Sequence, residues 1–165
     1  MNNKIIIIAG DPNSINSEII FKCWKKLSKN IRKKIFVIGN YNILIKQFKK
    51  LKFKIDLIKS NISSNANYPN KLKVIDIPLK FKKPFNVNKQ DSSKYLIRSL
   101  NLAHDLATKK KIKGFINCPI NKNLIKSSKK NGVTEYLANK SKIVNNSEVM
   151  MIYNKELSVV PLTTH

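Results

Sequence analysis

The stretch IIIIAGDPN, residues 5–13, decides the fold class of this 165-residue chain. Its unbroken run of β-branched residues is typical of a strand that is buried on both faces of a parallel sheet. Glycine, aspartate, proline and asparagine then end the strand in a turn. A helix is predicted next over 17–28, because apolar residues recur there at steps of three and four while lysines occupy the other positions.

The alternation of strands and helices continues along the chain. Further strands are predicted at 34–38, 53–58, 72–77, 113–117, 148–153 and 156–162, and further helices at 41–51, 92–110, 122–128 and 134–140. The long helix is expected to begin behind a serine cap, at Ser92 or Ser93, and 61–70 is expected to be a loop. This order predicts an α/β fold of three layers, α/β/α, in which helices cover both faces of a largely parallel sheet.

The chain is strongly basic, with 33 Lys+Arg against 9 Asp+Glu and a formal net charge of +24. Such a balance is typical of proteins that bind nucleic acid or anionic membranes. Nearly all of the excess is lysine, however, and A/T-rich codons encode lysine, isoleucine and asparagine alike. Nucleic-acid readers favour arginine, whose planar group pairs bidentately with phosphates and bases, and this chain has only Arg32 and Arg98. No nucleic-acid partner is therefore expected, and a basic nucleic-acid-binding domain is kept as the alternative from a different class.

Cysteine content and hydropathy indicate the cellular compartment of the protein. Cys23 and Cys118 are the only cysteines, too few for a disulfide framework or a cysteine-rich zinc site. The apolar run at 5–9 is too short for a signal peptide or a membrane span. We therefore expect a protein of the reduced cytoplasm with no membrane partner.

Four side chains could carry chemistry but support no single reaction by themselves. Asp11 could orient a substrate or only shape the turn, and both interpretations stay open. Lys122, beside a predicted turn, could receive an anion. Cys118 is interpreted as a small buried side chain, and His104 as a partly buried or surface residue of the long helix.

The last residues, VVPLTTH at 159–165, belong to or directly follow a predicted strand. Functional residues of open α/β sheets lie just beyond the carboxyl ends of the strands, so a site is expected to begin here and the chain is expected to be truncated after His165. His165 could ligate a metal, although the chain offers it no partner ligand. Thr134 could cap a helix or direct its hydroxyl at a ligand.

Five motifs in order resemble those of one enzyme family, the 4-hydroxythreonine-4-phosphate dehydrogenases (the PdxA family of vitamin B6 biosynthesis). The resemblance begins with GDP at 10–12 and SEI at 17–19, and includes the long helix around 95–103. It continues with NCPINK at 117–122, GVTEYLA at 132–138, and the block that starts with VMM at 149–151 and ends with TTH at 163–165.

The resemblance implies that residues 1–165 are the N-terminal portion of a two-domain dehydrogenase with an isopropylmalate-dehydrogenase-like fold, a homodimer when full length. Such enzymes oxidise the C3 hydroxyl of 4-phosphooxy-L-threonine, a small phosphorylated hydroxy amino acid, with NAD or NADP, and the product then loses carbon dioxide. Three histidines hold a divalent metal (Zn, Mg or Co), and the first of them falls on His165. The family's substrate-binding pair falls on Val133 and Thr134.

Two departures from the family pattern bear on these expectations. Val133 stands where the family has histidine, and valine cannot donate a hydrogen bond. In the first loop, Ser14, Asn16 and Ser17 replace two glycines and a proline. A dehydrogenase of another phosphorylated hydroxy acid, such as 4-phosphothreonate, and a non-catalytic paralogue are the alternatives. Because the other metal ligands are expected beyond His165, the isolated chain is predicted to be inactive.

Overall fold

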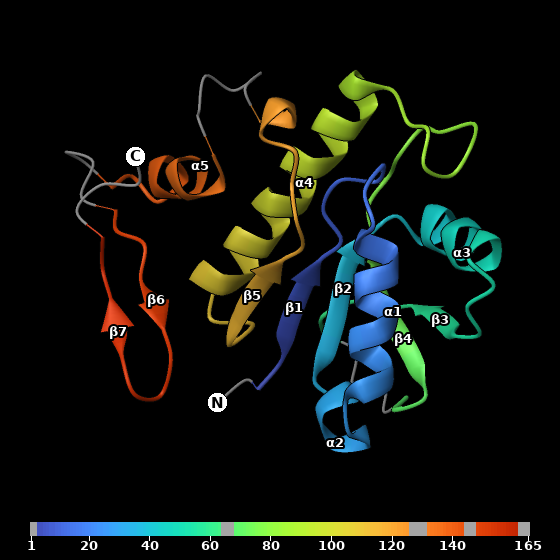
Figure 1. Cartoon of the computed structure of the whole chain (residues 1–165), viewed down its shortest axis with the longest axis horizontal. Helices are drawn as coiled ribbons and strands as arrows, with labels where there is room; N and C mark the ends of the chain where they lie inside the picture. Colours follow the sequence, from blue (N-terminus) through green and yellow to red (C-terminus); the bar gives the residue numbers. More distant parts are fainter. Residues whose placement is uncertain (1–2, 64–67, 126–131, 144–147, 162–165) are drawn as a thin grey trace.

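The structure is a computed structural model that describes residues 3–63, 68–125, 132–143 and 148–161 (Figure 1). The strands are β1 (Ile5–Ile8), β2 (Ile35–Gly39), β3 (Asp56–Lys59), β4 (Lys71–Asp76), β5 (Gly114–Asn117), β6 (Ile152–Tyr153) and β7 (Ser158–Val159). The helices are α1 (Asn16–Lys26), α2 (Lys29–Arg32), α3 (Tyr41–Lys50), α4 (Lys89–Thr108), the 3-10 helix η1 (Lys122–Leu124) and α5 (Val133–Lys140).

Five strands form one parallel sheet in the order β3-β4-β2-β1-β5. In the register, Ile6 of β1 lies opposite Phe36 of β2 on one side and Phe115 of β5 on the other. Every residue of β2 is buried, as the central position of this strand requires. The predicted α/β class and the parallel sheet are confirmed.

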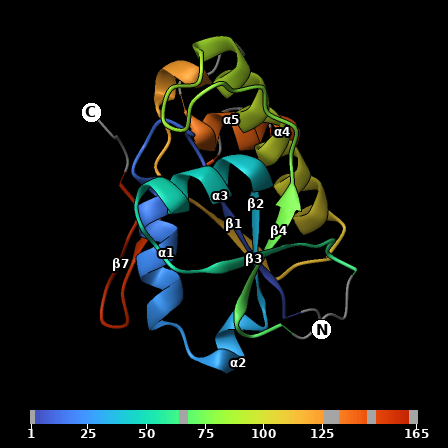
Figure 2. The same cartoon turned by 90° about the vertical axis from the view of Figure 1, so that its right-hand side faces the viewer.

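The side chains of β2 alternate between two hydrophobic cores, one on each face of the sheet. Phe36 and Ile38 belong to the core that includes Leu96 and Leu100 of α4. Ile35 and Val37 belong to the other core, which includes residues of α1 and α3, among them Trp24, Leu44 and Phe48. Figure 2 shows α1 and α3 on one side of the sheet and α4 on the other. The predicted three-layer arrangement is therefore confirmed.

The predicted serine cap of the long helix is wrong. The N-cap of α4 is Asn88, whose side-chain oxygen accepts a hydrogen bond from the backbone N–H of Asp91 at 2.8 Å. Ser92 lies inside the first turn and is fully buried, and its hydroxyl has no hydrogen-bond partner among the residues that the structure describes. The apolar stripe located the helix, but the asparagine four residues upstream begins it. The short helix α2, which Ser28 caps, was not predicted either.

The elements predicted near the C-terminus are longer than those observed. The helix predicted at 122–128 is the single turn η1, and 126–128 lie outside the described residues. The strands predicted at 148–153 and 156–162 reduce to the two-residue strands β6 and β7, which pair antiparallel and stand apart from the parallel sheet (Figure 1). Both strands are exposed throughout, so they lack the packing surface that lengthens strands.

Among the described helices, none combines the length and the apolar character that crossing a bilayer requires.

Candidate functional site

The candidate site lies at the carboxyl edge of the parallel sheet, where three connections meet. The arrowheads of β5, β1 and β2 point toward this edge in Figure 1. The β1–α1 loop, the long connection from β4 to α4, and the loop that joins β5 to η1 all begin here. Ligands of open α/β sheets bind at this edge.

Gly10 brings the β1–α1 loop against the loop after β5. Its φ of 71° lies in the left-handed region, which glycine adopts without steric cost. A Cβ atom at this position would lie 2.9 Å from the carbonyl oxygen of Pro119 and 2.6 Å from Nδ2 of Asn16. The glycine is therefore required both by the backbone conformation and by the close approach of the second loop.

Asn16 joins the same two loops with its side chain. Its Nδ2 donates to the carbonyl oxygen of Ala9 at 2.9 Å and to that of Pro119 at 2.8 Å. The side chain is buried as the first residue of α1. The asparagine that replaces a family glycine thus has a structural role, which sequence reasoning missed because its partner Pro119 is 103 residues away.

Asp11 is buried and shapes the turn after β1. Its Oδ1 accepts the backbone N–H of Asn13 at 2.9 Å, and its carbonyl oxygen accepts the N–H of Ser14 at 3.2 Å. This is the hydrogen-bond pattern of an Asx turn. Of the two interpretations left open for Asp11, turn formation is the one with observed contacts.

Asn13 ties the β1–α1 loop to the connection between β4 and α4. Its Nδ2 donates to the carbonyl oxygen of Val87 at 2.8 Å, and its Oδ1 accepts the N–H of Val87 at 2.8 Å. One side-chain amide therefore pairs with both backbone groups of a residue 74 positions away. The sequence showed only an asparagine in a turn, and nothing local indicates this partner.

Cys118 follows β5 and is buried in the core that α1 and α3 cover. Its backbone N–H donates to the carbonyl oxygen of Ile8 at 3.0 Å, which continues the pairing of β5 with β1. Burial raises the pKa of the Cys118 thiol to about 11, so the group is a thiol rather than a nucleophilic thiolate near neutral pH. Its interpretation as a small buried side chain is confirmed.

The phenol of Tyr95 lies at the carboxyl end of β2. Its hydroxyl accepts the backbone N–H of Asn40 at 3.2 Å, and burial raises the pKa of the phenol above its usual value. Asn40 caps α3, because its Oδ1 accepts the N–H of Ile43 at 2.9 Å, while its Nδ2 donates to the carbonyl oxygen of Ile77 at 2.8 Å. These contacts fix the end of β2, and burial keeps the phenol in its neutral form.

The remaining predicted site residues lie on η1 and α5. Lys122 is exposed on η1. Thr134 is exposed in the first turn of α5, whose N-cap is Gly132, so the hydroxyl of Thr134 is not the cap. Val133 is half-buried and packs against the core that includes α4. His165 lies outside the described residues.

The hydrogen bonds and ion pairs of the predicted site residues decide which of them the structure brings together. No hydrogen bond or ion pair within the described ranges links Asp11, Lys122 and Thr134 to one another. Those ranges also contain no group of three or more His, Cys, Asp or Glu side chains that could hold a metal ion. His104 is a partly buried helix residue, as interpreted, and its Nε2 lies 2.8 Å from Oγ of Ser141 at the end of α5.

Comparison with known proteins gives one consistent result. The family model described as "Pyridoxal phosphate biosynthetic protein PdxA" matches residues 31–165. The chain is 31% identical over 169 residues to a 4-hydroxythreonine-4-phosphate dehydrogenase from Aquifex aeolicus, covering 100% of this chain and 50% of that protein. It is 26% identical over 167 residues to one from Wigglesworthia glossinidia brevipalpis, covering 99% of this chain and 49% of that protein.

Solved structures show the same fold. A 4-hydroxythreonine-4-phosphate dehydrogenase from Burkholderia phymatum superposes with a TM-score of 0.83 at 21% identity, over 97% of this chain and 49% of that chain. The enzyme of the same name from Klebsiella pneumoniae gives a TM-score of 0.79 at 22% identity, over 96% and 50%. The chain spans about half the length of the relatives that it matches.

Proposed function

The chain belongs to the PdxA family of pyridoxal phosphate biosynthetic proteins, and from this premise we propose that it supplies one half of a 4-hydroxythreonine-4-phosphate dehydrogenase. The observation that carries the proposal is the match along the whole chain to two curated dehydrogenases of that name. The proposed reaction oxidises the C3 hydroxyl of 4-phosphooxy-L-threonine, with NAD or NADP accepting the hydride. The β-keto acid that forms then loses carbon dioxide.

The residues of this chain would bind and orient the substrate from the carboxyl edge of the sheet. Thr134 is exposed at the start of α5, so its hydroxyl is free to donate to a substrate oxygen. The exposed ammonium group of Lys122 would attract the phosphate or the carboxylate. Asp11 and Asn16 are assigned to holding the loop in shape, because their side chains already bond backbone groups.

The proposal includes a divalent cation (zinc, magnesium or cobalt), with His165 as one ligand. Bound to the substrate hydroxyl, such a cation would stabilise the developing alkoxide. The described residues do not supply a set of three ligands, so they do not by themselves fit the cation. The roles given to Thr134 and Lys122 do not depend on it.

A related phosphorylated hydroxy acid, such as 4-phosphothreonate, is the second candidate substrate. Val133 favours it, because a valine cannot make the hydrogen bond that the family's histidine makes at this position. The proposal further places the protein in the cytoplasm as a homodimeric oxidoreductase, with no nucleic-acid or membrane partner.

A chimaeric enzyme tests the proposal. This chain replaces the part of the Aquifex aeolicus dehydrogenase that aligns with it, and reduction of NAD or NADP is followed with 4-phosphooxy-L-threonine and with 4-phosphothreonate, in the presence of zinc, magnesium or cobalt. We expect turnover of one of the two substrates, and its loss by at least tenfold in Thr134→Ala. A Val133→His variant should shift the preference toward 4-phosphooxy-L-threonine. A folded chimaera that oxidises neither substrate would contradict the proposal and favour a non-catalytic paralogue.

A further inference from the structure

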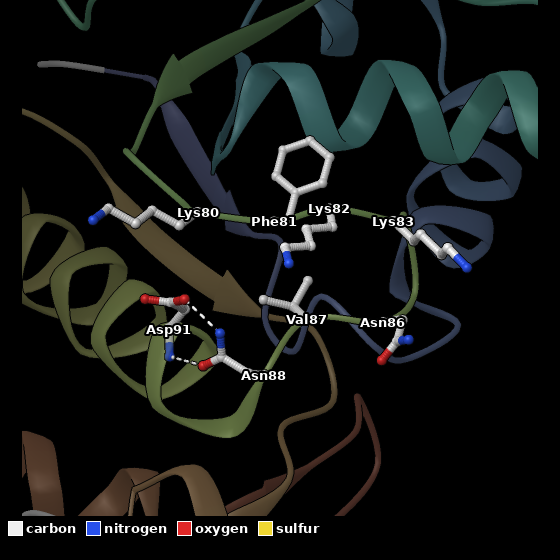
Figure 3. A pocket seen from close by; sticks show the side chains of 8 residues that line it. All are labelled: Lys80, Phe81, Lys82, Lys83, Asn86, Val87, Asn88 and Asp91. Carbon is white, nitrogen blue, oxygen red and sulfur yellow. Dashed lines mark hydrogen bonds between the residues drawn. The ribbon is translucent and has the colours of Figure 1, made fainter.

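A cavity lies in the connection between β4 and α4, one of the three connections that meet at the candidate site. It has a volume of about 620 Å³, within the range of small-molecule sites. Its walls include Lys80, Phe81, Lys82, Lys83, Val87 and Asn88. We call residues 80–88 the strap, because its two limbs, 80–83 and 86–88, lie on either side of the cavity (Figure 3).

The strap is held in a defined shape by backbone contacts. Lys83 and Asn86 form an antiparallel bridge at its tip, where Phe85 adopts a φ of 64°. Val87 is fixed at the other limb by its two hydrogen bonds to Asn13. The cavity is therefore built into the fold, and Val87 connects its lining to the β1–α1 loop.

The cavity is strongly positive. In Figure 3, Lys82 directs its ammonium group between the limbs toward Val87, whereas Lys80 and Lys83 extend past the two ends. None of these three lysines forms an ion pair with a residue in the described part of the chain. The one acidic residue in the lining is Asp91, and its Oδ2 is engaged by Nδ2 of Asn88 at 2.6 Å.

Further features of the lining favour an anion with an organic portion. The cavity opens beside the N-terminus of the 20-residue helix α4, where the helix dipole and the first backbone N–H groups attract negative charge. Asn86 adds a side-chain amide, and Phe81 and Val87 add apolar surface. The amide of Asn88, in contrast, is engaged by Asp91. The cavity is open to solvent and its volume suits one small ligand, whereas an extended polynucleotide strand needs a continuous groove.

We propose that the strap cavity binds a small molecule that carries a diphosphate group. Its phosphates would lie beside the ammonium group of Lys82, and the remainder would contact Val87. Lys80 and Lys83 would add positive charge at the two ends of the cavity. The lining residues of this cavity differ from the residues given roles in the proposed dehydrogenase reaction, and the binding proposed here does not depend on that reaction.

Titration with inorganic pyrophosphate tests this proposal on the 165-residue chain. Binding is measured by calorimetry at about 0.1 M salt, where diffuse surface attraction is screened, and backbone amide NMR shifts report its location. We expect saturable binding, with the largest shifts at 86–91. Lys82→Gln should weaken it at least fivefold. The matched control Lys109→Gln removes one exposed lysine at the far end of α4, and should change the affinity less than twofold.

Three outcomes would overturn the proposal. Equal weakening by Lys82→Gln and Lys109→Gln would mean that pyrophosphate binds the basic surface without a site. Shifts confined to residues outside the strap would place the site elsewhere. Binding to phosphatidylserine vesicles without any saturable binding of pyrophosphate would identify a membrane-attracted surface. Circular dichroism of both variants confirms that they are folded, as expected for exposed lysines.

Discussion

At Gly10, both the backbone conformation and the neighbouring atoms exclude a side chain. Two independent features exclude a side chain there, the positive φ and the carbonyl oxygen of Pro119. Gly114, at the start of β5, has neither: nothing lies within 4 Å of a Cβ atom built at that position. The two glycines therefore make a matched pair for separating local strain from the general effect of adding a methyl group.

We predict that Gly10→Ala lowers the free energy of unfolding by about 1–3 kcal/mol, because it adds backbone strain and a backbone clash. Gly114→Ala should leave it unchanged or raise it slightly, since alanine restricts the unfolded chain. Urea denaturation of both variants and the wild type measures the difference. Equal stability of the two variants would contradict the assigned role of Gly10.

Lys73 is a buried lysine on β4. It is 1% exposed, its ammonium group donates to the carbonyl oxygen of Lys33, and it lies 4.1 Å from the centroid of the Phe36 ring. Burial, with a smaller contribution from Lys4, lowers the pKa of Lys73 from 10.5 to about 8. The folded protein thus releases this proton more easily than the unfolded chain.

Stability should therefore rise with pH in one defined window. Between pH 8 and pH 10.5 the unfolded chain keeps the Lys73 proton that the folded chain has lost, so the free energy of unfolding increases. The increase is at most about 3 kcal/mol. Urea denaturation at several pH values should show it as a difference between wild type and Lys73→Met, which lacks the group. Parallel pH profiles of the two proteins would rule out the shifted pKa.

At the scale of elements, apolar patterning predicted the strands and helices that build the two cores. β1 and β2 are continuous apolar runs, and the stripe at three- and four-residue steps located α4. Patterning did not locate the ends of elements, which depend on single hydrogen bonds such as that of Asn88. It also overestimated β6 and β7, because an apolar sequence does not reveal whether a packing surface faces it.

Substitution of the cap tests how α4 begins. Asn88→Ala removes the acceptor of the Asp91 N–H and should cost about 1 kcal/mol of unfolding free energy. Ser92→Ala removes a buried hydroxyl that has no hydrogen-bond partner in the described structure, and should be neutral or stabilising. Thermal unfolding of the two variants distinguishes them. A larger loss of unfolding free energy in Ser92→Ala than in Asn88→Ala would contradict the assignment of Asn88 as the cap of α4.

At the scale of the whole molecule, positive charges far outnumber negative ones. The chain carries +24, and the lysine–carboxylate ion pairs seen in the described residues, Lys22–Glu18, Lys59–Asp76 and Lys140–Asp105, all lie in partly exposed positions. Exposed pairs of this kind contribute little to stability. Repulsion among the many lysines therefore opposes the compact state.

Added salt should stabilise the protein. Sodium chloride screens the repulsion between exposed lysines more than it weakens the few exposed ion pairs, so the urea midpoint is expected to rise from about 0.02 M to about 0.3 M salt, a span over which the screening length falls several-fold. The midpoint should rise with an unchanged dependence on urea. A midpoint that falls with salt would mean that attractive charge pairs dominate.

The chain by itself is predicted to be inactive as a dehydrogenase. It spans about half the length of the dehydrogenases that it matches, so half of their residues have no counterpart in it. Assays with 4-phosphooxy-L-threonine, NAD or NADP and zinc, magnesium or cobalt should therefore show no turnover. Clear turnover by the 165-residue chain would contradict this prediction.

The candidate site was predictable in position but not in detail. Its place at the carboxyl edge follows from the parallel topology, and the residues of the family motifs could be named from the sequence. The contacts that shape the edge could not, because Asn13 and Asn16 bond partners 74 and 103 positions away. Such contacts follow from the packed fold and leave no local pattern.

The double hydrogen bond between Asn13 and Val87 also makes this edge sensitive to protein ageing. Asparagine side chains hydrolyse spontaneously to carboxylates, and at Asn13 the donor that meets the Val87 carbonyl would become an anionic oxygen facing another oxygen. Deamidation of this single residue would remove the donor of one of the two hydrogen bonds that join the strap to the β1–α1 loop, and repulsion between the two oxygens would weaken that connection.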